Sequence, residues 1–468
     1  MTDVRPAVLL GAYASAIALA PNFSVRLMLA APLVAIPFGL WSLAGPQRWT
    51  VAFLCAALIL PPLPIPMGDS GPHLCLAIAA LGPFVSLLRM NQWRIRVESL
   101  HAGMLAYVGV LAASVAFAAV YSGPQIALAS LARVMLFAIS VFIFYYTAYG
   151  PGAGERDSKI FRIVYAAGVI SALFACIDFY FQLPAPAGFG PQFVWLESGV
   201  YRRAQGVFYE ASTLGNLCAF FLVTVAVSLS GIGSAAGKRP LSRVALLSGT
   251  VVFTSALMLS YSRASLVNLI VSILMLLFLQ RERIGLRRLL LLPSVALSAS
   301  AAASYFFFPR FTAFYWERLT ASVLYFFTAT EGILSGRLES WTVLTRFLSE
   351  HPWHAVFGVG YKTLPYSDFI GRPVIADNAY LSALVETGVI GLGAMLLFSF
   401  TVLGIAWRAM RSRDPQQSFF GTCVFCFWIG EMFQMMSGDL LTYWRVLPVY
   451  LWMLGMAARQ RGFESSSA

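Results

Sequence analysis

An acidic residue and an amide, Asp377 and Asn378, lie where a long polar segment gives way to an apolar stretch that begins AYLSALVETGVIGL. A carboxylate in this position can orient a substrate hydroxyl or accept its proton. Aspartate is also a good helix N-cap, so Asp377 could instead cap a helix that starts at Asn378 or Ala379. Asn378 has the same two interpretations, a cap or a substrate contact, and the residue types favour neither.

Five arginines form a second group of candidates, because a guanidinium pairs with phosphate oxygens through two parallel hydrogen bonds. They are Arg202, Arg203, Arg263, Arg337 and Arg372. Positive charge of this kind stabilises the negative charge that builds on a leaving diphosphate. Each arginine could instead extend to lipid phosphates or close a loop, and for any single one this is an equal alternative. Several arginines together favour an anion site.

The stretch HPWHAVFGVGY, at residues 351–361, adds His351 and Tyr361 as candidate substrate-binding groups. His351 and His354 could transfer protons, but beside a proline and a tryptophan they more often pack a loop or stack on a substrate. Glu210 could simply pair with the double arginine. Charges in or near apolar stretches are functional hypotheses as well; they are Arg133, Asp178, Glu386, Glu431 and Asp439.

The cysteines predict neither a metal site nor a disulfide framework. Cys423 and Cys426 have a spacing found in zinc sites, but no second pair or histidine cluster accompanies them, and a structural zinc site needs a full ligand set. All the cysteines lie in or beside apolar stretches, where this small side chain commonly packs. We therefore expect no metal and no other cofactor.

Composition determines the class of protein that must position these residues. Hydrophobic residues make up 59% of the 468-residue chain, charged residues make up 11%, and the mean hydropathy is +0.76. A water-soluble globular domain of this length would not have such values. Apolar stretches long enough to cross a bilayer recur, and such spans are helices whose backbone polar groups bond internally. The sequence therefore predicts an all-α polytopic membrane protein.

We predict about 14 transmembrane helices, because each span needs roughly 20 apolar residues. They are placed near residues 7–20, 27–44, 50–65, 73–88, 99–120, 126–149, 159–181, 212–233, 244–260, 263–280, 288–308, 379–407, 416–437 and 443–458. The predicted organisation has three parts. They are residues 1–308 with the first eleven helices and a loop near 182–211, the large loop 309–378, and residues 379–468 with the last three helices.

Basic residues orient this predicted bundle, because lysine and arginine are enriched in cytoplasmic loops. They gather in alternate short loops, so we expect that face and both termini to be cytoplasmic. The net charge of +12 is then a topology signal and does not predict a nucleic-acid partner. The loops 182–211 and 309–378 fall on the extracytoplasmic face with the five candidate arginines, which topology does not require there.

The larger extracytoplasmic loop is predicted to contain short amphipathic helices. Leu338, Trp341, Leu344 and Leu348 recur at helical spacing, and the stretch FTAFYWERLTASVLYFF is aromatic enough to lie on a bilayer surface. Long loops inside a compact bundle are usually functional or disordered. Helices of this kind would cap the bundle and would suit a substrate with a membrane-embedded tail and a water-exposed head.

The order and spacing of four motifs resemble the O-antigen ligase and Wzy-type polysaccharide polymerase family of bacterial inner-membrane enzymes. The motifs are YSRAS at residues 261–265, the helix from Arg337 to Trp341, the stretch 351–361, and DNAYLSALVETGVIGL from Asp377. Each is weak singly, and together they cover roughly residues 200–395. The resemblance implies a C-type glycosyltransferase-like fold. It also implies a metal-independent, inverting transfer of glycan from an undecaprenyl-diphosphate-linked oligosaccharide on the periplasmic face.

The resemblance also implies roles for individual residues. Family arginines that bind the donor diphosphate would correspond to Arg263 and, less securely, to Arg202 or Arg203. The family position that activates the acceptor hydroxyl would correspond to Asp377. Ligases carry histidine before the asparagine, whereas this chain carries aspartate, which favours a polymerase. Nearby arginines would make Asp377 orient the hydroxyl more than remove its proton.

The implied function is therefore a polymerase that moves a growing lipid-linked glycan onto a sugar hydroxyl of a second lipid-linked unit. Its partners would be the lipid-linked donor, the acceptor glycan, membrane lipids and, optionally, a chain-length regulator. An O-antigen ligase, which transfers glycan to the lipid A core, is the nearest alternative. A lipid-linked oligosaccharide flippase is the second, although no internal repeat indicates alternating access and the polar residues gather on one face.

Overall fold

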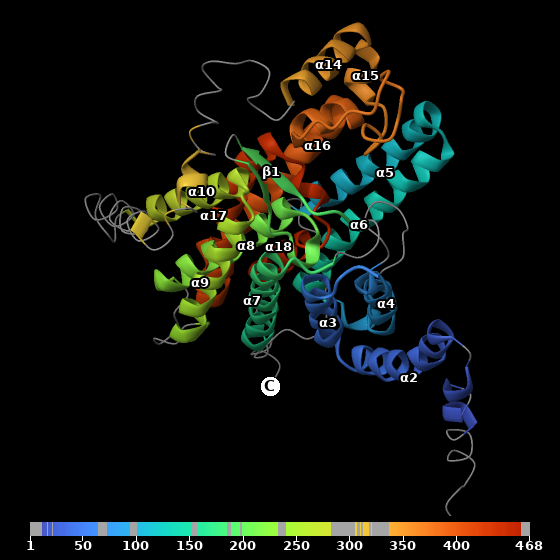
Figure 1. Ribbon diagram of the computed structural model, residues 1–468, viewed down its shortest axis with the longest axis vertical. Coiled ribbons are helices and arrows are strands. Elements are labelled where there is room, and N and C mark those ends of the chain that lie inside the picture. Colours follow the sequence, from blue (N-terminus) through green and yellow to red (C-terminus); the bar gives the residue numbers. More distant parts are fainter. Residues whose placement is uncertain are drawn as a thin grey trace, which may run out of the picture.

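The computed structural model describes residues 12–459, apart from residues 16, 21, 64–72, 94–100, 151–156, 185–188, 197–198, 233–239, 282–304, 307–308, 310–311, 318–319 and 321–336 (Figure 1). The described part is almost entirely helical. Its main helices are α2 (Phe23–Ala44), α3 (Pro46–Ile59), α4 (Leu74–Leu88), α5 (Ala102–Ser122), α6 (Pro124–Tyr149), α7 (Asp157–Phe181), α8 (Ala211–Leu229), α9 (Arg243–Leu259), α10 (Arg263–Leu279), α14 (Arg337–Glu350), α15 (Pro352–Phe357), α16 (Ala379–Met410), α17 (Pro415–Gln434) and α18 (Leu447–Ala458).

The prediction of an all-α membrane protein is confirmed at the level of class. Among the described helices, six are long and apolar enough to cross a bilayer, namely α5, α6, α7, α8, α16 and α17. Shorter apolar helices occupy most of the other predicted spans, at α2, α3, α4, α9, α10 and α18. The predicted span 7–20 falls partly outside the described residues, and 288–308 falls almost wholly outside them. The number of 14 spans and the three-part division stay predictions.

Helices α8 and α17 form the centre of the bundle. In their most apolar stretches, 83% and 78% of the residues are buried, against 33% in α5. Both helices pack on α10 and on each other, and α17 also packs on α16 and α18. Large aromatic side chains fill the space between them, with the rings of Phe220 and Phe427 5.0 Å apart. The residues at the ends of α8, α10 and α16 are therefore carried by a well-packed core.

A short hairpin interrupts the loop that was predicted near residues 182–211. Strand β1 (Phe193–Leu196) pairs with β2 (Gly199–Arg202) in antiparallel fashion, with Phe193 opposite Arg202. The all-α prediction missed this hairpin, because four-residue strands leave too short an alternation to detect among apolar spans. The hairpin leads the chain to the end of α9, where the Ala204 amide donates to the Leu259 carbonyl at 2.9 Å.

Helix α16 is broken near its start, at Gly388, whose φ of 71° and ψ of −173° are non-helical. The break lets loop amides reach carbonyls of α16: Val359 donates to Val385 at 3.1 Å and Gly360 donates to Glu386 at 2.8 Å. A side chain at Gly388 would collide with the Val356 carbonyl oxygen. The glycines of FGVGY and ETG therefore allow a close backbone contact that positions the loop before Asp377.

This contact predicts that Gly388→Ala strongly destabilises the protein. Alanine in the left-handed region costs about 1–2 kcal/mol, and the collision with the loop adds to this cost. Gly393→Ala, in the same helix, is the matched control, because a methyl group there meets no atom within 4 Å and should be neutral or slightly stabilising. Thermal unfolding of the two purified variants in detergent measures the difference. Equal unfolding temperatures would contradict the prediction.

Helix α14 confirms a short amphipathic helix in the larger loop. Leu344 and Phe347 are buried, Leu348 packs against them, and Leu338 is partly exposed. Figure 1 shows α14 and α15 beside the first part of α16, at one end of the molecule. Most of the aromatic stretch upstream of α14 lies outside the described residues. The described part of the loop thus covers the start of α16, where Asp377 lies.

Candidate functional site

Asp377 lies in the junction between α14 and α16 and forms an ion pair with Arg337, the first residue of α14. The Arg337 Nε and Asp377 Oδ2 atoms are 3.1 Å apart, and their side chains are 25% and 45% exposed. The indole of Trp341 donates to the Ala376 carbonyl at 2.6 Å and fixes the same junction. Asp377 itself has a φ of 45°, so its backbone is held in the left-handed region.

The N-cap of α16 is Asn378 and not Asp377. The Asn378 Oδ1 atom accepts hydrogen bonds from the amides of Tyr380 and Leu381 at 3.0 and 3.1 Å. Of the two interpretations that the residue types left open, the structure therefore assigns the cap to Asn378. The carboxylate of Asp377 points away from this cap and toward Arg337.

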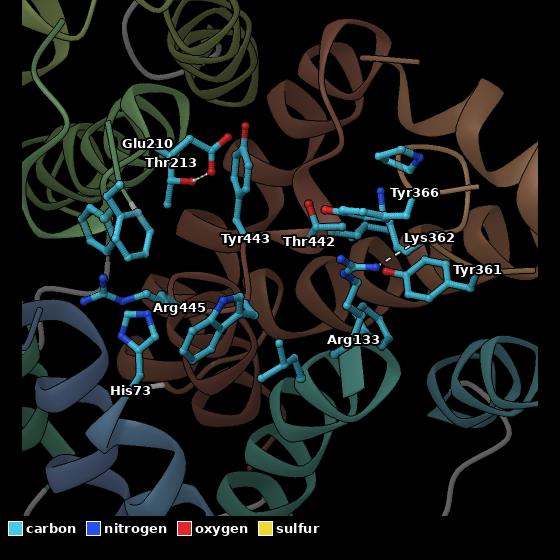
Figure 2. Close-up of a pocket in the computed structure, with 17 residues that line it drawn as sticks. His73, Arg133, Glu210, Thr213, Tyr361, Lys362, Tyr366, Thr442, Tyr443 and Arg445 are labelled. Atoms are coloured by element: carbon cyan, nitrogen blue, oxygen red, sulfur yellow. Dashed lines mark hydrogen bonds between the residues drawn. The ribbon is translucent and has the colours of Figure 1, made fainter. Parts of the chain in front are cut away.

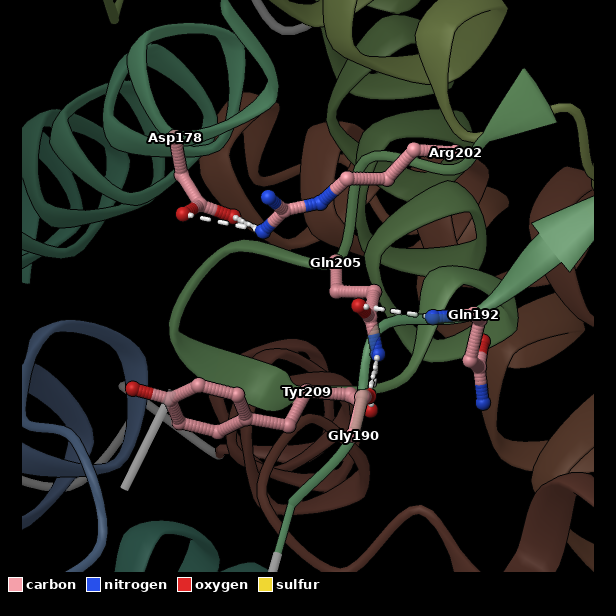
Figure 3. Close-up of polar contacts among 6 residues, drawn as sticks. All are labelled: Asp178, Gly190, Gln192, Arg202, Gln205 and Tyr209. Carbon is pink, nitrogen blue, oxygen red and sulfur yellow. Dashed lines mark hydrogen bonds and ion pairs between the residues drawn. The ribbon is translucent and has the colours of Figure 1, made fainter. Parts of the chain in front are cut away.

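The two neighbouring arginines at the end of β2 have different partners. Arg202 forms an ion pair with Asp178 of α7 at 3.4 Å (Figure 3). Arg203 donates from Nε to the Ser260 carbonyl at 2.8 Å, next to the start of α10. Arg202 is thus matched with an acid at the hairpin, whereas Arg203 extends toward Arg263.

Arg203, Arg263 and Arg337 share one electrostatic environment, and we call them the arginine cluster. The pKa of Arg203 is lowered, mainly by burial, and the cations of Arg263 and Arg337 lower it further. Tyr443 and Glu210 act in the opposite direction. Arg263, the first residue of α10, also interacts with Arg337. Three cations on different elements are therefore close enough to repel one another, which makes the cluster suited to an anion.

A buried glutamine holds the loop that carries Arg203. The Gln205 amide group donates to the carbonyls of Gly190 and Tyr209 at 3.1 and 2.8 Å, and its Oε1 atom accepts from the Gln192 amide at 3.1 Å (Figure 3). The Gln192 side chain in turn accepts from the amide of Ala211. These bonds connect the hairpin directly to the start of α8.

Glu210, the last residue before α8, was considered in the sequence only as a partner of the double arginine. Its Oε2 atom accepts a hydrogen bond from the Thr213 hydroxyl at 2.7 Å. The pKa of Glu210 is raised, mainly because burial disfavours the charged carboxylate, and the negative charge of Asp377 adds to this effect. The hydrogen bond from Thr213 and the cation of Arg203 act in the opposite direction. Glu210 therefore lies in the environment of the arginine cluster and of Asp377. Tyr443 and Asp377, which also act on Glu210, are distant along the chain, so the sequence alone did not indicate their proximity.

A cavity of about 260 Å³ adjoins the arginine cluster (Figure 2). Glu210 and Tyr443 line it and also interact with Arg203. Its walls combine aromatic rings with charged and hydroxyl groups; they include His73, Arg133, Phe189, Phe208, Thr213, Tyr361, Lys362, Tyr366, Thr442, Trp444 and Arg445. Lys362 forms an ion pair with Asp439. Burial alone would lower the pKa of Lys362, but the carboxylates of Asp439 and Glu386 raise it above its ordinary value.

Of the remaining sequence candidates, Tyr361 lies in the wall of the cavity, whereas His351 and Arg372 are not among the residues that line it. Tyr361 is buried in the cavity wall, and its carbonyl accepts from Ser130 at 2.6 Å. His351 is the N-cap residue before α15 and stacks on Phe347 with ring centres 4.9 Å apart, which is a packing contact. Arg372 forms an exposed ion pair with Glu339 at 2.7 Å, and an exposed pair of this kind contributes little stability.

A buried amide network joins the helices under the cluster. Asn216 of α8 and Asn268 of α10 both donate to one oxygen of Glu431 in α17, at 2.7 and 2.8 Å. They also donate to Gln434 at 3.1 and 2.9 Å, and Tyr450 of α18 donates to Asn216 at 2.6 Å. Buried polar groups in apolar surroundings must be hydrogen-bonded. The network therefore fixes the positions of the helices that carry Arg263 and Glu210.

Among the described residues, no group of three or more His, Cys, Asp or Glu side chains could hold a metal ion. Cys423 and Cys426 are both buried within α17. The groups gathered at the site are cations, carboxylates and hydroxyl groups. Such a set can bind a diphosphate, stabilise its departure and take up a proton.

The comparison with protein families agrees with the resemblance seen in the motifs. Residues 248–397 match the family model described as O-antigen ligase, and the resemblance to the O-antigen ligase and Wzy family is thereby confirmed. The matched part includes Arg263, Arg337 and Asp377, whereas Arg203 and Glu210 precede it. No curated protein matches the chain.

Proposed function

We propose that the protein is a polymerase of bacterial surface polysaccharide of the O-antigen, capsule or exopolysaccharide type. It transfers an undecaprenyl-diphosphate-linked glycan to a sugar hydroxyl of a second lipid-linked unit. The family match supports glycan transfer of the ligase and polymerase type in general. The observation that carries the proposed diphosphate donor is the arginine cluster, which gathers three cations beside two carboxylates.

In this proposal the arginine cluster binds the donor diphosphate. Negative charge builds on the leaving diphosphate as the bond to the anomeric carbon breaks, and guanidinium groups already in place stabilise it without a metal. Arg263 begins α10, and Arg203 lies in the loop after β2 and donates to the Ser260 carbonyl. Arg337 comes from α14, and Asp377 holds it through their 3.1 Å ion pair. Because this pair occupies one oxygen of its carboxylate, Asp377 is better suited to orienting Arg337 than to removing a proton from the acceptor hydroxyl.

The proposed location is the bacterial inner membrane, with the site on the periplasmic face and both termini in the cytoplasm. The distribution of basic residues in alternate loops supports this orientation. The apolar helices of the described part support a multi-pass membrane protein. The partners in this proposal are the lipid-linked oligosaccharide, the acceptor glycan and membrane lipids.

An O-antigen ligase is the second candidate, because the matching family model carries that description. The aspartate at position 377, in place of histidine, favours the polymerase. The lipid-linked pool in cells without the gene separates the two. A missing polymerase leaves single lipid-linked repeat units, whereas a missing ligase leaves long glycan still attached to the lipid. Long lipid-linked chains in such cells would contradict the polymerase.

The two arginines at the end of β2 provide a paired test of the diphosphate site. Arg203→Ala is expected to reduce glycan transfer about a hundredfold or more, because a cation aimed at the developing charge is lost. Arg202→Ala is expected to lower thermal stability instead, since it leaves the carboxylate of Asp178 without its cation. Transfer per amount of folded protein, measured in membranes with lipid-linked repeat units, compares them. Equal losses in both variants would argue against the assignment to Arg203.

A further inference from the structure

Glu210 occupies the boundary between the arginine cluster and the cavity. It lines the cavity, and it interacts with Arg203 and with Asp377. Figure 2 shows its carboxylate beside Tyr443, with the cavity continuing past Tyr443 toward Lys362. Among the described residues that line the cavity, Glu210 is the single carboxylate. A molecule in the cavity and a diphosphate on the cluster would therefore meet at Glu210.

The two carboxylates near the cluster differ in their surroundings. Asp377 is engaged by Arg337 and its side chain is 45% exposed. Glu210 is partly buried and accepts a hydrogen bond from the neutral hydroxyl of Thr213. Burial also raises the pKa of Glu210, against the smaller effects of Thr213 and Arg203. A carboxylate in a buried site, with a pKa closer to neutrality, is the better proton acceptor.

The walls of the cavity have the chemistry that binds a sugar ring. The rings of Tyr361, Trp444 and Phe208 provide flat apolar surfaces, on which the apolar face of a pyranose can stack. The hydroxyl group of Thr442 and the ammonium group of Lys362, which pairs with Asp439, provide polar contacts in the same wall. A mostly apolar pocket with a few fixed polar groups is typical of a small-molecule site.

We propose that this cavity binds the terminal sugar of the acceptor glycan and that Glu210 accepts the proton of its attacking hydroxyl. The inference rests on the proposed function, because it takes the cluster as the diphosphate site. The acceptor oxygen forms a bond to the anomeric carbon of the donor, while the bond from that carbon to the diphosphate oxygen breaks. The electron pair of the broken bond leaves with the diphosphate, and the proton passes to Glu210.

Glu210→Gln and Glu210→Ala test this inference in the purified full-length protein, reconstituted in nanodiscs with lipid-linked repeat units from cells that lack the gene. Both variants are expected to transfer glycan at least about a hundredfold more slowly. Binding of undecaprenyl diphosphate alone should stay within about threefold of the wild type, which is under 1 kcal/mol. Added formate should restore Glu210→Ala about tenfold or more, because it replaces the missing carboxylate.

The pH profile gives a readout that a structural role would not change. A base must be deprotonated to act, so wild-type transfer should decline as the pH falls through the raised pKa of Glu210. The formate-rescued variant should instead follow the lower pKa of formate. Transfer by Glu210→Gln above about a tenth of the wild-type rate, or no rescue by formate, would overturn the role of Glu210.

The Arg263→Ala variant, measured beside Glu210→Gln, shows whether a negative result contradicts the role of Glu210 alone or the proposed function as a whole. This variant should lose both diphosphate binding and transfer, because it removes a cation of the arginine cluster. An active Glu210→Gln beside an inactive Arg263→Ala would refute only the role of Glu210. Normal diphosphate binding and transfer by Arg263→Ala would refute the proposed function, and this inference with it.

Discussion

Replacing Arg263 with alanine is expected to abolish long-chain polymer and to leave single lipid-linked repeat units. Arg263 begins α10 and belongs to the arginine cluster. Loss of one preorganised group that stabilises a leaving charge typically reduces turnover by about 10²–10³-fold. Gel analysis of surface glycan and of the lipid-linked pool measures the effect in cells that carry only the variant gene. Immunoblotting of membranes shows whether the amount of protein is unchanged.

Arg243→Ala is the matched control for Arg263→Ala. Arg243 also begins an apolar helix, α9, but its side chain is exposed. The distribution of basic residues predicts that this end of α9 faces the cytoplasm. Its removal should leave polymer length unchanged. Arg263→Lys should retain part of the activity, because lysine keeps the charge but loses the two-pronged hydrogen bonding. Normal polymer from Arg263→Ala would remove the main support for the proposed function.

Asp377→Asn is expected to have the second largest effect, a loss of transfer of about a hundredfold. The substitution keeps the shape of the side chain but removes the charge that orients Arg337 across the junction of α14 and α16. Transfer and diphosphate binding should fall together, because Arg337 loses its position in the arginine cluster. Reconstituted protein with native lipid-linked units measures both quantities.

Glu339→Gln serves as the control for Asp377→Asn. It also breaks an ion pair of α14, but both side chains of that pair are more than half exposed, so neither transfer nor stability should change much. If Asp377→Asn keeps diphosphate binding and loses only transfer, Asp377 contacts the acceptor, as its place in the sequence motif first indicated. If it keeps both, Asp377 has no role in the reaction.

Most helix positions followed from the sequence because a bilayer imposes length and apolarity on each span. The span expected at 263–280 is α10, Arg263–Leu279, and the span expected at 126–149 is α6, Pro124–Tyr149. The break at Gly388 was not predicted, because the apolar stretch continues without interruption on both sides of it. It depends on a loop more than twenty residues upstream along the chain, whose amides bond to the carbonyls of α16.

The candidate residues were easier to find than their partners. Arg263, Arg337 and Asp377 were marked by charge in an apolar chain and by their motifs. The choice between Arg202 and Arg203 could not be made from their types, because it depends on Asp178 in α7 and on the carbonyl of Ser260. The sequence indicated the interaction of Glu210 with Arg203, whereas its proximity to Tyr443 and Asp377 could not be predicted because these residues are distant in sequence.

The amide network around Glu431 has a consequence for how the protein can handle chains of unequal length. It ties α8 to α10 through the buried side chain of Glu431 in α17. The spacing between Glu210 and Arg263 is therefore set by the membrane core and is independent of α14. In the proposed function, a longer glycan that shifts α14 would move Arg337 but would leave Glu210 and Arg263 in place, so these two groups would meet each added unit at the same spacing.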